Sequence, residues 1–204
     1  MTKKELIKRL EIPRTLLHVG LALSISLSYY FFLSKTVIIL TLSLIMLIFL
    51  FFEINKRLAT GVGIKYVTTL KHFIRISELG KKWIGALTAL IGYLLAILFF
   101  PQRIAVVSIL FLGIGDPFAR YIRIFRNKRS HFGKLALGTL GMFVICFLIS
   151  YFIGKYSLET SVVVACGTAF TESFIDIRVT EAFNIDDNIL VPIIGGLILY
   201  LLTL

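Results

Sequence analysis

The sequence predicts an all-α integral membrane protein, built as a single bundle of about seven transmembrane helices. Of its 204 residues, 58% are hydrophobic and only 16% are charged, and the mean hydropathy is +0.93. Several apolar runs approach the roughly 20 residues that a helix needs to cross a bilayer. Residues 1–204 therefore form one transmembrane helical domain, because so short a chain leaves no room for a soluble domain.

Seven apolar runs follow one another along the chain. We expect spans at about 15–33, 36–52, 83–100, 104–119, 135–153, 160–175 and 189–204. The fourth and sixth runs are short and end in polar residues. In the long loop after the second span, Gly61 to Gly63 are expected to break the chain, and 64–76 to form an amphipathic helix at the membrane surface. We expect no cleavable signal peptide, because no small-residue cleavage site follows the first long run.

The basic residues predict the orientation. Of the 22 lysines and arginines, 19 fall at the N-terminus and in the loops after the second, fourth and sixth spans; the exceptions are Lys35, Arg103 and Lys155. The positive-inside rule then predicts a cytoplasmic N-terminus. Every acidic residue except Glu159 falls on the same side. The net charge of +11 would therefore attract anionic lipid head groups or a nucleotide at that face. Nucleic acid is not an expected partner, because there is no soluble binding domain.

The most informative segment lies at the end of the fourth run. Asp116 follows Gly115 and precedes Pro117, and Arg120 and Arg123 come soon after. A carboxylate at the end of a membrane helix is costly and points to a function. Phosphate-bound Mg²⁺ takes one or two protein carboxylates, and arginines pair with phosphate oxygens. Asp116 is therefore predicted to bind a metal, with a helix cap as the alternative.

The fifth run begins with a lysine followed by small residues. Lys134 could contact phosphates as a point charge, or it could only anchor the helix in the membrane. Gly138 and Gly141 would let a backbone approach closely, which suits either a ligand or tight helix packing. The sequence does not separate these uses.

Two further acidic groups stand near the ends of the last two runs. Glu172 near the end of the sixth run is a candidate second metal ligand or general base, or else a partner for a basic residue. Asp186, Asp187 and Asn188 directly precede the last run. One helix cap needs one such residue, so a metal or nucleotide role is predicted for Asp187 and Asn188.

Two ionisable pairs have the spacing of one helical turn. Arg14 and His18 share a face at the start of the first span, and Glu53 and Arg57 do so at the end of the second. Site participation and structural pairing are equally open for all four.

Taken in order, these residues resemble the family of CTP-dependent polyprenol and lipid kinases, which includes dolichol kinase, phytol kinase and the CTP-type diacylglycerol kinase. The resemblance covers most of the chain and depends on the order of six short motifs. These are Arg14 with His18; Glu53 with Arg57; Gly115, Asp116 and Ala119; Lys134, Gly138, Thr139 and Gly141; Phe170, Glu172 and Ser173; and Asp186, Asp187, Asn188 and Pro192. The family usually continues from Gly-Asp toward a Gly-Arg pair, where this chain has Arg120 to Phe125.

The resemblance implies a kinase that transfers the γ-phosphoryl group of CTP to a lipid alcohol at the cytoplasmic face. The alcohol would be a polyprenol or dolichol, a phytol-like isoprenoid alcohol or diacylglycerol. Asp116, Asp187 and Glu172 would hold Mg²⁺, and His18 or Glu172 would accept the alcohol proton. The nucleotide phosphates would contact Lys134, Arg120, Arg123, Gly115, Gly138, Thr139 and Asn188. The alternatives are a CTP-dependent cytidylyltransferase that makes a CDP-activated lipid, and a non-enzymatic transporter or lipid-binding protein.

Overall fold

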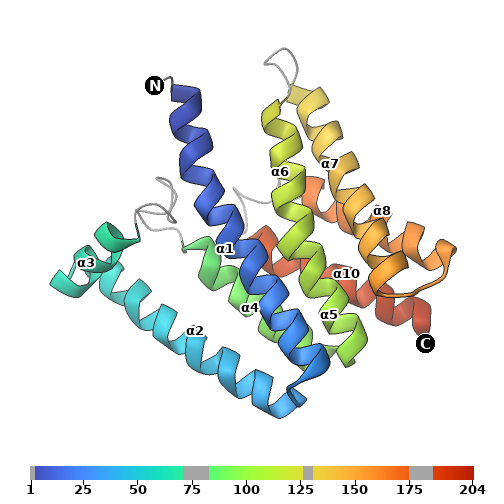
Figure 1. The fold of residues 1–204 in the computed structure, drawn as a ribbon, viewed down its shortest axis with the longest axis horizontal. Helices are drawn as coiled ribbons and strands as arrows, with labels where there is room; N and C mark the ends of the chain where they lie inside the picture. Colours follow the sequence, from blue (N-terminus) through green and yellow to red (C-terminus); the bar gives the residue numbers. More distant parts are fainter. Residues whose placement is uncertain (1–2, 71–82, 126–130, 175–185) are drawn as a thin grey trace.

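The computed structural model describes residues 3–70, 83–125, 131–174 and 186–204, and within them the side chains of 12–70, 83–122, 136–173 and 186–204. These residues form helices and no strand, so the all-α fold class is confirmed for the part of the chain described (Figure 1). The helices are α1 (Lys3–Phe31), α2 (Lys35–Arg57), α3 (Gly61–Thr69), α4 (Gly85–Phe99), α5 (Gln102–Leu110), the π-helix η2 (Phe111–Gly115), α6 (Asp116–Phe125), α7 (His131–Leu148), the π-helix η3 (Ile149–Ile153), α8 (Leu158–Phe174) and α10 (Asp187–Thr203).

Each of the seven predicted ranges overlaps a helix. In the described ranges, three helices are long and apolar enough to cross a membrane: Lys35–Arg57, Gln102–Ile122 and Ala136–Ile153. The helices α4 and α10 are apolar but shorter. These properties fit a helical membrane protein. The number of spans and the side on which the N-terminus lies stay predictions.

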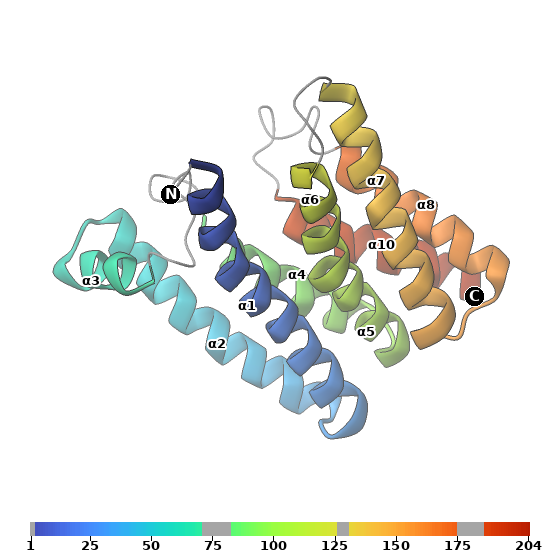
Figure 2. The ribbon, with the colours of Figure 1, turned by 45° about the horizontal axis from the view of Figure 1, so that its top comes forward.

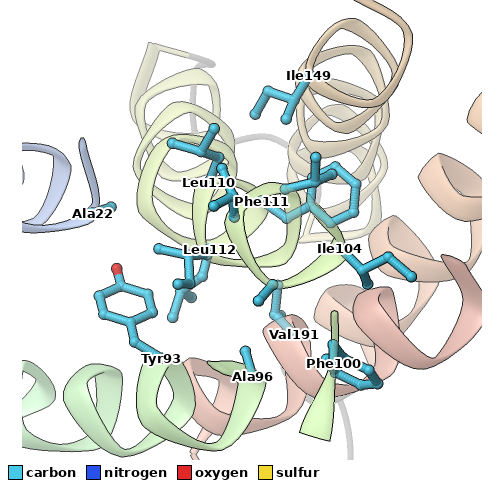
Figure 3. Packing of buried hydrophobic residues seen from close by; sticks show 14 of the residues in the cluster. Ala22, Tyr93, Ala96, Phe100, Ile104, Leu110, Phe111, Leu112, Ile149 and Val191 are labelled. Atoms are coloured by element: carbon cyan, nitrogen blue, oxygen red, sulfur yellow. The ribbon is translucent and has the colours of Figure 1, made fainter. Parts of the chain in front are cut away.

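The run α5–η2–α6 is the central helix of the bundle. It packs against α1, α4, α7 and α10, and 78% of its most apolar window is buried, against 17% for α2. Figures 1 and 2 show α2 and α3 on one side of this helix and α7 and α8 on the other. The buried core surrounds η2, where Phe111 and Leu112 lie against side chains such as Tyr93 and Val191 (Figure 3).

The central helix extends beyond the expected end of the fourth span. The prediction ended that span near residue 119, with Asp116 close to the membrane surface, but helical structure continues to Phe125. A π-helical turn directly before Asp116 accommodates Pro117, which has no backbone N–H to donate within the helix. Asp116 consequently lies inside the bundle, with only 4% of its surface exposed.

The segment after α2 also differs from the prediction. Gly61 to Gly63 do not break the chain but begin α3, because the Thr60 hydroxyl caps this helix by accepting a hydrogen bond from Gly63 N at 3.1 Å. A side chain at position 63 would collide with the carbonyl oxygen of Asn55. Glycine therefore lets α3 lie close against the end of α2. The rest of the expected surface helix, from residue 71 on, lies outside the described residues.

Candidate functional site

Asp116 is a buried carboxylate with a cationic partner one turn further along the helix. The Nη2 atom of Arg120 lies 2.5 Å from Asp116 Oδ2 and donates a hydrogen bond to it. The Asp116 side chain is 6% exposed and that of Arg120 is 22% exposed. A buried charge is tolerated only when it is paired. Arg120 therefore supplies the partner that a buried carboxylate needs and connects Asp116 with the bundle surface.

Two polar side chains from other helices lie near Asp116. The rings of His18 on α1 and Tyr93 on α4 have their centroids 6.4 Å apart, and the charge of Asp116 acts on both. Figure 3 shows the Tyr93 hydroxyl directed away from α4, toward the side where Ala22 of α1 lies. Among the residues that the structure describes, His18 Nε2 and Tyr93 Oη are buried and have no hydrogen-bond partner. A bound substrate could supply the missing partner.

Two further expected site residues, Arg14 of α1 and Arg120 of α6, belong to the surroundings of His18. The charges of Arg14, one turn before His18, and of Arg120 also act on the His18 ring. A side chain at Gly113 would collide with Ala22, so this glycine lets α1 approach the central helix closely. The predicted Arg14–His18 pair thus belongs with Asp116, Arg120 and Tyr93. These five residues are called the group around Asp116 below.

Side-chain hydrogen bonds join the start of α10 to α4. Asp186 caps α10 by accepting a hydrogen bond from Asn188 N at 3.1 Å, and it accepts another from Thr88 Oγ1 at 3.0 Å. The Asn188 side chain donates to Thr88 Oγ1 at 3.0 Å and to Gly85 O at 3.4 Å. Asp186 therefore has the cap role, and the amide group of Asn188, for which a nucleotide contact was expected, joins two helices.

Asp187 belongs electrostatically to the group around Asp116. The charges of Asp116, Arg120 and Asp186 act on its carboxyl group. Its Oδ1 atom also accepts a hydrogen bond from Asn188 N at 2.9 Å. The folding of the chain thus brings within electrostatic range two carboxyl groups that are 71 positions apart in the sequence.

The donor chemistry of this pair can be compared with the needs of Mg²⁺. No three His, Cys, Asp or Glu side chains within the described ranges are grouped as around a metal ion. The expected trio of Asp116, Asp187 and Glu172 is therefore not assembled there. Mg²⁺, however, is usually held by one or two carboxylates while it keeps several waters. Asp116 and Asp187 have the donor chemistry that this smaller requirement asks for.

Glu172 is buried near the end of α8, next to a residue that contacts α7. It is 3% exposed, and its neighbour Ser173 shares a short hydrogen bond with Thr139 of α7. Thr139, expected to contact a phosphate, thus has a hydroxyl partner on α8. Phe170, from the same motif, is 67% exposed on the outside of the helix.

The small residues of the motifs are used for close helix packing. A side chain at Gly115 would lie 2.6 Å from Met142 Sδ of α7, and one at Gly141 would lie 2.6 Å from Ile122 Cδ1. Ala119 is fully buried, next to Gly141, and Gly138 is also buried. The packing interpretation of Gly141 is therefore supported, and Gly115 has the same use.

The Glu53–Arg57 pair forms a separate ionic group at the end of α2. Glu53 is 1% exposed, and its Oε1 atom lies 2.7 Å from Lys56 Nζ and 3.5 Å from Arg57 Nε. The Arg57 guanidinium lies 3.9 Å from the centroid of the Trp83 ring. Structural pairing is thus observed for both residues, with Lys56 as an additional partner.

Sequence reasoning missed the polar residues of α4. Tyr93 and Thr88 lie in an apolar run, where single hydroxyl groups are common, and only the adjacent Gly92 indicates a close helix contact. The side chains of Lys134 and Arg123, which were expected to bind phosphate, lie outside the described side chains.

Comparisons with protein families, with curated proteins and with solved structures found no match for this chain. The resemblance to the lipid kinases therefore stays a prediction based on motif order. The functional interpretation below depends on the residues and geometry around Asp116.

Proposed function

We propose that the protein is a multi-pass membrane kinase that transfers the γ-phosphoryl group of CTP to a lipid alcohol at the cytoplasmic face. The observation that carries this proposal is that the charge of Asp116, on the central helix, acts on two ionisable side chains of other helices, His18 of α1 and Asp187 of α10. Acidic metal ligands and a buried base are the parts that phosphoryl transfer to an alcohol requires. The nucleotide identity and the acceptor class follow from the family resemblance alone.

In this proposal Asp116 and Asp187 hold Mg²⁺, which when bound neutralises charge on the transferred phosphoryl group. Arg120 fixes the position of the Asp116 carboxylate through its 2.5 Å hydrogen bond. Because 22% of its side chain is exposed, Arg120 also stands where an incoming phosphate can meet a guanidinium. Phosphate binding by Arg120 would use the planar geometry that distinguishes arginine from lysine.

His18 is the proposed acceptor of the alcohol proton. The alcohol oxygen bonds to the γ-phosphorus while the bond from that phosphorus to the β,γ-bridging oxygen breaks, which releases CDP. The proton of the alcohol passes to His18 Nε2, a buried nitrogen with no hydrogen-bond partner among the described residues. The Tyr93 ring lies beside the His18 ring, with centroids 6.4 Å apart, and its hydroxyl would orient the alcohol oxygen. Glu172 is the alternative proton acceptor.

The lipid alcohol can approach His18 along the outer face of α1. Leu16 is 67% exposed and Leu17 is 36% exposed, so apolar side chains beside His18 face the surroundings of the bundle. A lipid tail would lie against these residues while its hydroxyl group points inward to the imidazole. This route keeps the tail in the bilayer during the reaction.

The deciding experiment labels the two ends of the nucleotide triphosphate separately. Purified protein in mixed micelles is incubated with Mg²⁺, CTP and a panel of polyprenols, phytol, diacylglycerol and phosphatidic acid. We expect label from the γ-phosphate, and not from the α-phosphate, to enter the lipid. Entry of the α-label into phosphatidic acid with release of pyrophosphate would identify a cytidylyltransferase instead. If neither label enters any lipid, the kinase proposal is wrong and a transport or lipid-binding role gains support.

A further inference from the structure

A large apolar pocket lies between α2 and α3, away from the group around Asp116. Its volume is about 440 Å³, within the range of roughly 300–1,000 Å³ typical of small-molecule sites. Phe49 and Phe52 of α2 and Val62 and Tyr66 of α3 line it. The rings of Phe52 and Tyr66 are stacked with centroids 5.0 Å apart and form one wall. The pocket contains none of the residues assigned to phosphoryl transfer.

This pocket lies on the outer surface of the helix bundle. Only 17% of the most apolar window of α2 is buried, and the lining residues Ile48 and Val62 are 49% and 48% exposed. In Figures 1 and 2, α3 lies at the outer edge of the molecule, beside the end of α2. Because α2 is apolar and long enough to cross a membrane, the pocket would open into lipid. An acyl chain is the apolar group that a bilayer supplies there.

One cation lines this otherwise apolar pocket. Lys65 contributes to the pocket and is exposed, and within the described part of the chain it makes no ion pair. The carboxylate of Glu53, at the end of α2, is already paired with Lys56 at 2.7 Å. An ammonium group beside an apolar pocket complements a negatively charged head group above an acyl chain. We propose that the α2–α3 pocket binds one acyl chain of an anionic phospholipid, whose head-group phosphate pairs with Lys65.

The test measures how many lipids stay bound to the purified full-length protein. Protein in detergent is exposed to equal amounts of phosphatidylglycerol and phosphatidylcholine of the same acyl composition, and bound lipids are counted by native mass spectrometry. We expect wild-type protein to retain phosphatidylglycerol at least 5-fold more than phosphatidylcholine. Lys65→Glu should remove this preference while the acyl chain still binds. Val62→Trp should fill the pocket and reduce retention of both lipids.

The control for charge is Lys155→Glu, because Lys155 is exposed on the connection before α8, and Figure 1 shows α8 and α3 on opposite sides of the molecule. This variant should keep the wild-type preference. Equal retention of the two lipids by wild-type protein, or an unchanged preference in Lys65→Glu, would overturn the proposal. A wild-type dimer that Val62→Trp dissociates without loss of lipid would assign the pocket to a second copy of the chain. Because no nucleotide is present, these outcomes are independent of the kinase assay.

Discussion

Burial and pairing determine what Asp116 can do. A carboxylate that is 4% exposed is costly to keep in a protein interior, and the Arg120 guanidinium at 2.5 Å offsets part of that cost. An ion pair with a purely structural role would need only these two side chains. The proximity of Asp187, a second carboxylate, raises the electrostatic cost and is the feature that a bound divalent cation would relieve.

The first prediction concerns the charge of Asp116. Asp116→Asn should lower phosphoryl transfer on the order of 100-fold or more, because it removes a charge placed at the reacting phosphate. The assay is γ-label transfer from CTP into lipid. Glu159→Gln is the matched control, since Glu159 is exposed on α8 and its loss should leave the rate unchanged. Wild-type activity in a correctly inserted Asp116→Asn protein would remove Asp116 from the site.

The second prediction separates stability from activity at Tyr93. Tyr93→Phe removes a buried hydroxyl that has no hydrogen-bond partner among the described residues, so it should raise the free energy of unfolding by about 1 kcal/mol. Activity should fall, because the hydroxyl is proposed to orient the alcohol. Denaturation in detergent micelles measures the first effect. A marked loss of stability would show that the hydroxyl already has a partner inside the folded protein.

At the residue scale, sequence reasoning found the ionisable groups and missed the hydroxyl groups. Asp116, Asp187 and His18 were predictable because charged or basic side chains next to apolar runs are rare and costly. Tyr93 was not predictable, because a tyrosine in an apolar helix is ordinary. The pairing of Asn188 with Thr88 depends on the position of α10 against α4, which no local pattern specifies.

At the scale of elements, the contact between α4 and α10 depends on the absence of a side chain. Gly92 lies where an added Cβ would collide with the carbonyl oxygen of Asn188 and would lie 3.1 Å from Pro192 Cγ. A backbone atom cannot move aside as a flexible side chain can. The position of Asp187, next to Asn188, therefore depends on this glycine.

The third prediction tests that dependence. Gly92→Ala should lower the free energy of unfolding by about 2–3 kcal/mol through overpacking, and it should reduce activity by moving Asp187. Thermal unfolding in detergent micelles measures the stability. Gly20→Ala on α1 is the control, because an added Cβ there meets nothing within 4 Å; this change should be neutral or slightly stabilising. Equal melting temperatures for the two variants would show that α10 can shift without cost.

Helix positions were largely predictable, whereas helix ends were not. Each apolar run overlaps a helix because length and hydrophobicity are properties of the run itself. The central helix continues past the expected span because η2 lets it pass through Pro117, and the boundary of the span itself stays a prediction. The start of α3 was misplaced because the Thr60 cap outweighed the two glycines.

At the scale of the whole molecule, the charge distribution makes a prediction about sidedness. In the predicted topology, Lys65 of α3 belongs to the strongly basic side, while Lys155 belongs to the side with few charges. Two native cysteines complicate labelling, since Cys146 is buried but Cys166 is exposed. Their replacement by alanine gives a background for single introduced cysteines.

The fourth prediction uses this background. In intact cells, a membrane-impermeant thiol reagent should label Lys155→Cys but not Lys65→Cys, because the positive-inside rule places Lys65 in the cytoplasm. Labelling of both after membrane permeabilisation is the control for accessibility. The opposite pattern would reverse the predicted orientation and move the site around Asp116 to the other side of the membrane.

The π-helical turn at Phe111–Gly115 sets the angular phase between the two halves of the central helix. An α-helix rotates by about 100° per residue, and a π turn accommodates one residue more than an α turn. Every side chain after Gly115 is therefore rotated by about that angle relative to an uninterrupted helix. If the same residues formed an uninterrupted α-helix, the apolar composition of both halves would be preserved, but the Asp116 carboxylate would be rotated by about 100° away from His18. The direction in which the site faces is thus encoded by one inserted residue.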